Sequence, residues 1–214
     1  MSIGSAIRGL LGAKLARHAG LRYRSIFVNL DKVALALSGF IQRDAHLLDI
    51  GGGDGQPLNH LLALRPDLTI TTFDPAPSVG QWIDPRYSRQ VIRLPGTNLA
   101  DYLASERASP DAILIADVMH HIPEATREGF LNSVKVLLDR APRLQIIVKD
   151  VEPGSWRASL GFWSDRYITG DRNVSPISSE QVAKLFERIL GPLQRDDTNL
   201  LRMDRPNYAM VFHR

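Results

Sequence analysis

The stretch LLDIGGGDG, residues 47–55, places a glycine-rich turn directly after a short apolar run. Asp49 and Asp54 flank the glycines, and Pro57 follows at a position where proline favours the start of a helix. A glycine turn between a buried strand and a helix is typical of open α/β sheets, whose ligands bind at the carboxyl ends of the strands. The stretch therefore predicts an α/β fold with a ligand site at this turn.

The rest of the chain repeats this alternation of short apolar runs and helical patterns. Five runs have the continuous apolar character of strands buried on both faces of a parallel sheet: residues 45–50, 68–74, 89–94, 111–118 and 144–150. The spacing of apolar residues predicts four helices between and after these strands: residues 56–66, 98–105, 124–141 and 178–190.

Two further strand-like runs, residues 193–203 and 207–214, follow the last helix, and only a short link separates them. Strands joined by so short a link must be antiparallel. The predicted fold is therefore a three-layer α/β/α sandwich around a Rossmann-like, seven-stranded, mostly parallel sheet with an antiparallel last strand. We expect this domain to span residues 43–214, behind an N-terminal helical cap at residues 1–42.

The first helix of the cap has an apolar stripe that also contains cations. Apolar residues recur at helical spacing from Ile3 to Leu15, but Lys14 and Arg17 fall within the same stripe. A helix lying in a membrane interface keeps its cations on the opposite face, so the pattern favours packing over the protein's own surface. A lid over the site and contact with a membrane surface both stay open. A second helix is expected within residues 25–41.

Composition narrows the class of protein. Of the 214 residues, 44% are hydrophobic and 23% charged, which is ordinary for a globular domain, and no internal repeat is found. The absence of cysteine excludes disulfides, thiolate nucleophiles and cysteine-ligated zinc, and we expect no metal site. The net charge of +3 comes from scattered cations with no polybasic block, so nucleic acid is not indicated as a partner. Without a signal peptide or membrane-spanning run, a cytoplasmic location is expected.

The glycine turn can be tested against the dinucleotide fingerprint Gly-x-Gly-x-x-Gly. With Gly51 and Gly53 as the first two glycines, the third position falls on Gln56, so the fingerprint fails. The electrostatics agree, because a pyrophosphate bound at the helix N-terminus would be repelled by Asp49 and Asp54. A nicotinamide or flavin dinucleotide is therefore not the expected ligand.

The turn does match Asp-x-Gly-x-Gly-x-Gly, through Asp49, Gly51, Gly53 and Gly55. This resembles the first motif of the class I S-adenosylmethionine-dependent methyltransferases. That cofactor carries an ammonium and a sulfonium and no phosphate, so carboxylates around a glycine turn suit it. The resemblance extends over residues ~40–214 and implies the same seven-stranded fold, with S-adenosyl-L-methionine as the cofactor.

The resemblance also assigns cofactor contacts beyond the turn. Asp74, followed by Pro75 at the end of the second strand, corresponds to the acidic residue that binds the two ribose hydroxyls in the family; a strand-ending cap is the alternative. After the third strand, many members have an acidic residue that binds the adenine amino group. This chain has Gly96, Thr97 and Asn98 instead, so an amide or a hydroxyl would have to make that contact.

The fourth strand ends at Asp117, which the resemblance assigns to the cofactor and which could instead cap the next helix. The residues after it, MHHIP, resemble a segment of the family in which His-His often follows this strand. A neutral histidine is suited to take a proton from the acceptor, so His121 and His120 are candidate general bases. Because they are adjacent, we expect them to point in different directions, with at most one facing the site. Asp150 is a further candidate base, unless it pairs with the neighbouring Lys149 or caps the backbone.

Aromatic residues gather after the fifth strand, where the acceptor is expected to lie. Trp156, Phe162, Trp163 and Tyr167 fall within about 25 residues. They could line a pocket for a flat or amphipathic acceptor, or pack inward as core. A phenol, a sugar hydroxyl or a lipid-like molecule would all suit such a pocket, and O, N and C all stay open as the methylated atom.

The sequence therefore predicts an S-adenosylmethionine-dependent methyltransferase that acts on a small molecule, as a monomer or homodimer. Two alternatives remain. A nucleic-acid methyltransferase would be expected to carry a basic channel, and the Asn-Pro-Pro-Tyr-type motif of the base-amine enzymes is absent after the fourth strand. A catalytically silent, cofactor-binding partner subunit is compatible with every motif described.

Overall fold

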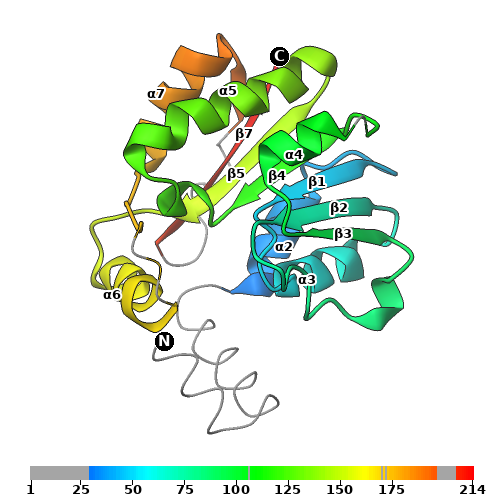
Figure 1. Cartoon of the computed structure of the whole chain (residues 1–214), viewed down its shortest axis with the longest axis horizontal. Helices are drawn as coiled ribbons and strands as arrows, with labels where there is room; N and C mark the ends of the chain where they lie inside the picture. Colours follow the sequence, from blue (N-terminus) through cyan, green and yellow to red (C-terminus); the bar gives the residue numbers. More distant parts are fainter. Residues whose placement is uncertain (1–28, 106, 170, 172, 197–205) are drawn as a thin grey trace, which may run out of the picture.

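The computed structural model describes residues 29–105, 107–169, 171, 173–196 and 206–214. Its centre is a seven-stranded sheet in the order β3-β2-β1-β4-β5-β7-β6 (Figure 1). The strands are β1 His46–Ile50, β2 Thr69–Asp74, β3 Val91–Pro95, β4 Ala112–Ala116, β5 Gln145–Val151, β6 Gln194–Asp196 and β7 Asn207–His213. The first five pair in parallel, and β7 runs antiparallel to both β5 and β6. The predicted fold is confirmed.

The strand order reverses at β1, which has β2 on one side and β4 on the other. The segments that leave β1 and β4 at their carboxyl ends therefore run in opposite directions and leave room for a ligand between them. The glycine turn lies at this point of the sheet, because it directly follows β1.

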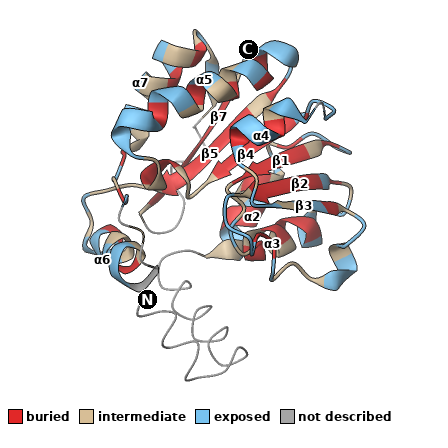
Figure 2. Ribbon diagram, viewed as in Figure 1, coloured by how far each residue is buried: buried red, intermediate tan, exposed pale blue. Residues whose placement is uncertain are grey.

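Helices cover both faces of the sheet. They are α2 Leu30–Ser38, α3 Gln56–Leu64, α4 Leu99–Ala104, α5 Glu124–Arg140, α6 Trp156–Ser164 and α7 Ser179–Leu190, with short helical turns at η1 Pro85–Tyr87, η2 Met119–His121 and η3 Asp165–Thr169. Residues of α4, α5 and α7 share one core with the sheet, and residues of α2 and α3 share the other. The helices are buried on their inner faces and exposed outside (Figure 2). By contrast, α6 lies beyond the sheet, apart from both layers (Figure 1).

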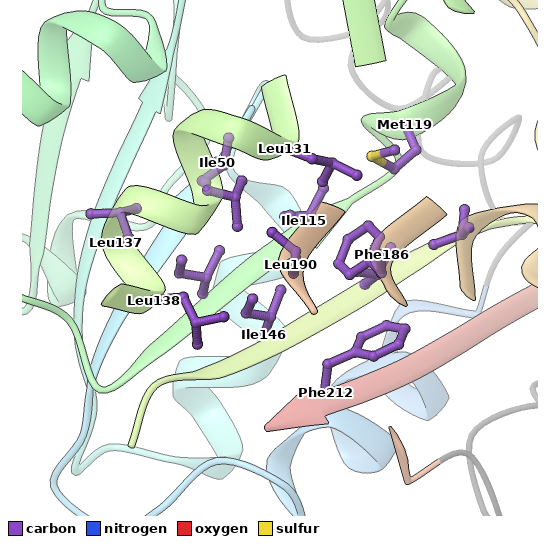
Figure 3. Close-up of a cluster of buried hydrophobic side chains, with 14 of the residues drawn as sticks. Ile50, Ile115, Met119, Leu131, Leu137, Leu138, Ile146, Phe186, Leu190 and Phe212 are labelled. Carbon is purple, nitrogen blue, oxygen red and sulfur yellow. The ribbon is translucent and has the colours of Figure 1, made fainter. Parts of the chain in front are cut away.

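The core under α5 and α7 shows why the sequence folds this way. Along α7, Val182, Phe186 and Leu190 recur at helical spacing and are buried. The ring of Phe186 stacks on Phe212 of β7 at 4.7 Å between centroids, and Leu131 of α5 belongs to the same cluster (Figure 3). Ser178 begins α7 with a capping box, in which its side chain and Gln181 each bind the other's backbone amide.

The N-terminal cap is described only in part. Residues 1–28 lie outside the described residues, so the predictions for the first helix, as lid or as membrane-surface helix, stay predictions. The second predicted helix is found as α2, with Asn29 as its N-cap and Gly39 as its C-cap. Its buried residues share a core with β1 and α3. The division at residues 42 and 43 also stays a prediction.

One strand is shorter than the sequence predicts, and another is described only in part. The run at 193–203 contains β6, Gln194–Asp196, and its residues 197–203 lie outside the described residues. The run at 111–118 ends as a strand at Ala116, because Asp117 has a positive φ of 56° that breaks the extended conformation. In the part of the chain that the structure describes, no helix is both long and apolar enough to cross a membrane.

Candidate active site

The glycine turn connects β1 to α3 in a backbone conformation that requires glycine. Gly51, Gly53 and Gly55 all have positive φ, at 74°, 51° and 78°, so conformation alone accounts for their identity. Gly53 differs in one respect: a Cβ built on it would meet no atom within 4 Å, whereas one on Gly51 would lie 2.6 Å from Val118. The turn is therefore packed against the protein at Gly51 and open at Gly53, where a ligand can approach the backbone.

Asp49 lies buried beneath this turn. Its Oδ2 accepts a hydrogen bond of 2.7 Å from the hydroxyl of Thr72 on β2. Burial raises the pKa of Asp49 to about 6; the Thr72 bond opposes that rise and the nearby Asp74 adds to it. Asp49 is therefore a buried carboxyl group whose raised pKa brings its change of charge close to neutral pH.

Asp74 ends β2 and is tied directly to the glycine turn. Its Oδ2 accepts from the amide of Gly53 at 3.2 Å, and its Oδ1 accepts from the amide of Ala76 at 2.7 Å. The residue thus caps the backbone, as its alternative role predicted, but a carboxylate has about four acceptor positions. Two positions remain for ligand hydroxyls, so the two roles are compatible. The structure brings Asp74 and Gly53 together, as the strand-end argument predicts.

The segment after β3 lies beside Asp74. The amide of Thr97 donates to the backbone oxygen of Asp74 at 3.1 Å. The side chain of Asn98 accepts from the amide of Asp101 and begins α4 with a capping box. One lone pair of the Asn98 oxygen is thereby used within the fold, which leaves the second lone pair as an acceptor and the NH₂ group as a donor for a ligand.

Asp117 holds the turn after β4 in place through a buried lysine. Its backbone amide donates to the oxygen of Lys149 at 2.8 Å, and the Lys149 Nζ lies 2.5 Å from its Oδ1. The sequence offered Lys149 as a partner for Asp150, but the structure pairs it with Asp117 across β4 and β5. Because a Cβ at Gly51 would clash with Val118, this turn lies close beside the glycine turn.

His120 and Asp150 form a buried pair at the carboxyl end of β5. The His120 Nδ1 lies 2.5 Å from Asp150 Oδ1, and the amides of His120 and Val151 also donate to this carboxylate. Burial lowers the pKa of His120, but interactions with Asp150 and Asp165 outweigh this and raise it to about 10. The buried Asp150 thus stabilises the imidazolium and faces His120, not the space above the strands.

His121 forms a second, more exposed pair with Asp171. Its Nδ1 lies 2.5 Å from Asp171 Oδ2, and 37% of its side chain is exposed. The rings of His120 and His121 lie side by side, with centroids 4.0 Å apart and planes tilted by 41°. The expectation that adjacent histidines point apart is therefore wrong, because the helical turn η2 brings both rings to the same side.

The aromatic segment lies next to these histidines. The ring of Phe162 on α6 meets His120 edge-on at 5.5 Å, and Trp163 contacts Tyr167 at 5.4 Å. Trp163 and Tyr167 are each 52% exposed, and Trp156 is 68% exposed with Arg157 stacked on it. Three of the four aromatic side chains are thus not core residues, and Phe162 is the one that reaches the histidine pair.

Three polar residues of the site were not assigned a role from the sequence: Thr72 under Asp49, Asp171 on His121 and Asp165 near His120. Lys149 was named only as a partner for Asp150, so its contact with Asp117 was not predicted. Only Asp165 carried a signal, because it lies among the aromatic residues. The others become visible only when the neighbouring strands and loops are in place.

Part of the sequence matches a known family, and the fold is similar to that of solved structures. Residues 48–142 match a family model described as a methyltransferase domain. No curated protein matches the chain. Among solved structures, an O-methyltransferase family protein from Burkholderia thailandensis has a TM-score of 0.66 at 15% identity, over 95% of this chain and 60% of its own.

Two further structures are similar. The methyltransferase CalO1 of calicheamicin biosynthesis, in its SAH-bound form, has a TM-score of 0.66 at 17% identity, over 99% of this chain and 60% of its own. Human N-acetylserotonin methyltransferase in complex with SAM has a TM-score of 0.58 at 18% identity, over 87% of this chain and 52% of its own. This chain thus spans about 52–60% of the length of these three proteins. Residues 48–142 match the methyltransferase domain model, and the chain has the fold of the class I S-adenosylmethionine-dependent methyltransferases.

Proposed function

We propose that this protein is an S-adenosylmethionine-dependent methyltransferase that acts on a small-molecule acceptor. One observation carries the proposal: the glycine turn is open at Gly53 and is bordered by carboxylates from the ends of two neighbouring strands, Asp49 and Asp74. A cationic, phosphate-free ligand suits this arrangement, whereas a pyrophosphate does not. The residues that we propose to hold the cofactor are Asp49, Gly51, Gly53, Gly55, Asp74, Pro75, Thr97, Asn98 and Asp117.

The cofactor, when bound, supplies a methyl group on a sulfonium that is already activated. The protein's own part is to hold the two reactants in line and to manage the proton of the acceptor. The turn at Gly53 and the remaining acceptor positions of Asp74 would fix the cofactor. The residues after β4 and β5 lie at the same edge of the sheet, so the acceptor would be bound there.

The acceptor side of the proposed site combines the polar histidine turn η2 with the aromatic residues of α6 and η3. His120 and His121 are the proposed proton acceptors, and Asp150 supports His120. Of the two, His121 suits a base in the absence of any bound cation, because its ring is partly exposed and the raised pKa of His120 keeps that ring protonated at neutral pH. Phe162, Trp163, Tyr167 and Trp156 would cover the acceptor. A hydroxyl of a natural product, sugar or lipid-like molecule is the proposed methyl acceptor.

Calorimetry with S-adenosylhomocysteine and with NAD tests the cofactor assignment. We expect micromolar binding of S-adenosylhomocysteine and none of NAD; the reverse result would overturn the proposal. Incubation with methyl-labelled S-adenosylmethionine and a panel of phenols, sugars, lipids and nucleic acids tests the acceptor. Label on nucleic acid alone would favour the nucleic-acid methyltransferase. Cofactor binding with no labelled product would favour a silent partner subunit.

The Asp74→Ala variant is expected to bind S-adenosylhomocysteine at least ~10-fold more weakly. Each charge-assisted hydrogen bond to a ribose hydroxyl contributes about 1.5–3 kcal/mol, and the variant also loses the bond that holds the Gly53 amide. Asp74→Asn keeps one acceptor oxygen and should lose less. Asp139→Ala removes an exposed carboxylate on α5 and serves as the control. Unchanged affinity in Asp74→Ala would limit Asp74 to its capping role.

Cofactor affinity is also expected to depend on the charge of Asp49. The pKa of this buried carboxyl is raised to about 6. The unliganded protein therefore loses stability when this carboxyl ionises, as the pH rises through 6. A ligand ammonium nearby favours the ionised form, so S-adenosylhomocysteine should bind more weakly below pH 6, by up to ~10-fold per pH unit. Calorimetry between pH 7 and 5 measures this, and Asp49→Asn should flatten the profile. An equally steep profile in Asp49→Asn would assign the dependence to another group.

A further inference from the structure

Three side chains of the types that bind metal ions lie close together above the carboxyl ends of β4 and β5. His120 and His121 belong to η2, and Asp165 begins η3 after α6. One potential ligand atom from each lies within 4.8 Å of the other two. Ligand atoms around a transition metal are about 3–3.5 Å apart for bonds of ~2.0–2.2 Å, so small side-chain rotations would close the set.

The two histidines are held in the way that metal-binding histidines are held. Each Nδ1 contacts a carboxylate at 2.5 Å, Asp150 for His120 and Asp171 for His121. A carboxylate on one ring nitrogen fixes the tautomer and the ring orientation, and it makes the other nitrogen a better ligand. The Nε2 atoms are therefore the nitrogens that face a further partner, and on His120 a cation would have to replace the Nε2 proton that the raised pKa retains.

The Nε2 of His120 is the second, independent observation. His120 is 3% exposed, and its Nε2 has no hydrogen-bond partner among the described residues. The Oδ2 of Asp165 lies 3.6 Å away, within the range of an ion pair but too far for a hydrogen bond. Buried polar atoms in native proteins nearly always have a hydrogen-bond partner, and a cation bound between this nitrogen and Asp165 would supply the closer partner that His120 lacks.

We propose that His120, His121 and Asp165 bind a divalent transition-metal cation of the Zn²⁺ type. Two imidazoles and one carboxylate form a ligand set that Zn²⁺, Co²⁺ and Fe²⁺ accept, with at least one coordination position left for another oxygen. The expectation of no metal site rested on the absence of cysteine, which excludes thiolate sites and has no bearing on imidazole and carboxylate ligands.

The cation would lie on the acceptor side of the site. If the proposed function is right, the open coordination position would bind the acceptor oxygen, and the cation would lower the pKa of the acceptor hydroxyl. The acceptor hydroxyl would then release its proton to solvent water on binding the cation, because an imidazole nitrogen that holds the cation cannot also receive the proton. This role rests on the proposed function; the cation site itself rests only on the geometry.

Titration of the full chain with the cation alone tests the site. The untagged, chelator-treated protein is titrated with Zn²⁺ by calorimetry and with Co²⁺ by visible absorption, without cofactor or acceptor. We expect one saturable site per chain, with Zn²⁺ displacing Co²⁺. Asp171→Asn should weaken Zn²⁺ binding by about 10–100-fold, because it removes the carboxylate charge that holds the His121 ring. His121→Gln and Asp165→Asn remove a ligand and should weaken binding by more.

His60→Gln is the matched control, because His60 also has its Nδ1 on a carboxylate, Asp31, but lies far along the chain on α3. Its affinity for Zn²⁺ should equal that of the unchanged protein. Absence of saturable binding, or equal binding in His121→Gln, Asp165→Asn and His60→Gln, would overturn the site. Each variant is also titrated with S-adenosylhomocysteine as a check of folding. A protein that binds S-adenosylhomocysteine but no cation refutes only this inference, and the reverse result refutes only the cofactor proposal.

Discussion

Replacing Asp150 with alanine is expected to lower the free energy of unfolding by about 3–5 kcal/mol. Asp150 is fully buried, and its carboxylate accepts hydrogen bonds from the His120 ring, the His120 amide and the Val151 amide. The alanine variant leaves all three donors in a space that water does not reach, and an unpartnered buried donor costs about 1–3 kcal/mol. Urea denaturation at neutral pH, in the presence of a chelator, measures the loss.

Asp150→Asn is the control for this prediction. Asparagine has nearly the same shape and keeps one oxygen for an amide donor, so we expect a smaller loss than for alanine. Equal losses in the two variants would show that the charge, and not the set of hydrogen bonds, stabilises this end of β5. A loss below ~1 kcal/mol in Asp150→Ala would show that water replaces the missing carboxylate.

Phe186→Ala is expected to cost a similar amount, about 3–5 kcal/mol, for a different reason. Phe186 is fully buried between α7 and the sheet, stacked on Phe212. Truncation removes its apolar contacts and leaves a cavity that the strands beneath cannot fill, because β7 is paired on both edges. Chemical denaturation measures the loss. Leu35→Ala, at a side chain of α2 that is largely exposed, should stay within about 0.5 kcal/mol of the unchanged protein.

The sequence predicted the strands and long helices because burial leaves a direct pattern. Strands covered on both faces read as unbroken apolar runs, so β1, β2, β4 and β5 were found at nearly their observed bounds. The edge strand β6 has no unbroken apolar run, because Gln194, Arg195 and Asp196 are not buried. Its antiparallel pairing with β7 was predicted from the short link between the two runs and not from burial.

The part of the candidate site that lies at the carboxyl ends of the strands was predictable from the sequence, because these ends meet at one edge of the sheet. Asp74 and the glycine turn were expected at the same edge of the sheet, and the structure joins them through the Gly53 amide. The ion pairs were not predictable: Lys149 reaches Asp117, 32 residues away, and His121 reaches Asp171, 50 residues away. Which of several carboxylates a buried cation faces depends on side-chain rotamers and loop paths, and a single sequence records neither.

Val118 lies so close to Gly51 that a Cβ at Gly51 would clash with it, which places the two halves of the site side by side. Val118 follows Asp117, which is held by Lys149, and it precedes the histidine turn η2. In the proposed methyltransferase, a ligand that shifts the glycine turn would therefore also shift the backbone that carries His120 and His121. Coupling of this kind is reciprocal in binding free energy, so the bound cofactor would strengthen acceptor binding by the same factor by which the bound acceptor strengthens cofactor binding. The expected signature is a higher affinity for the acceptor in the presence of S-adenosylhomocysteine than in its absence.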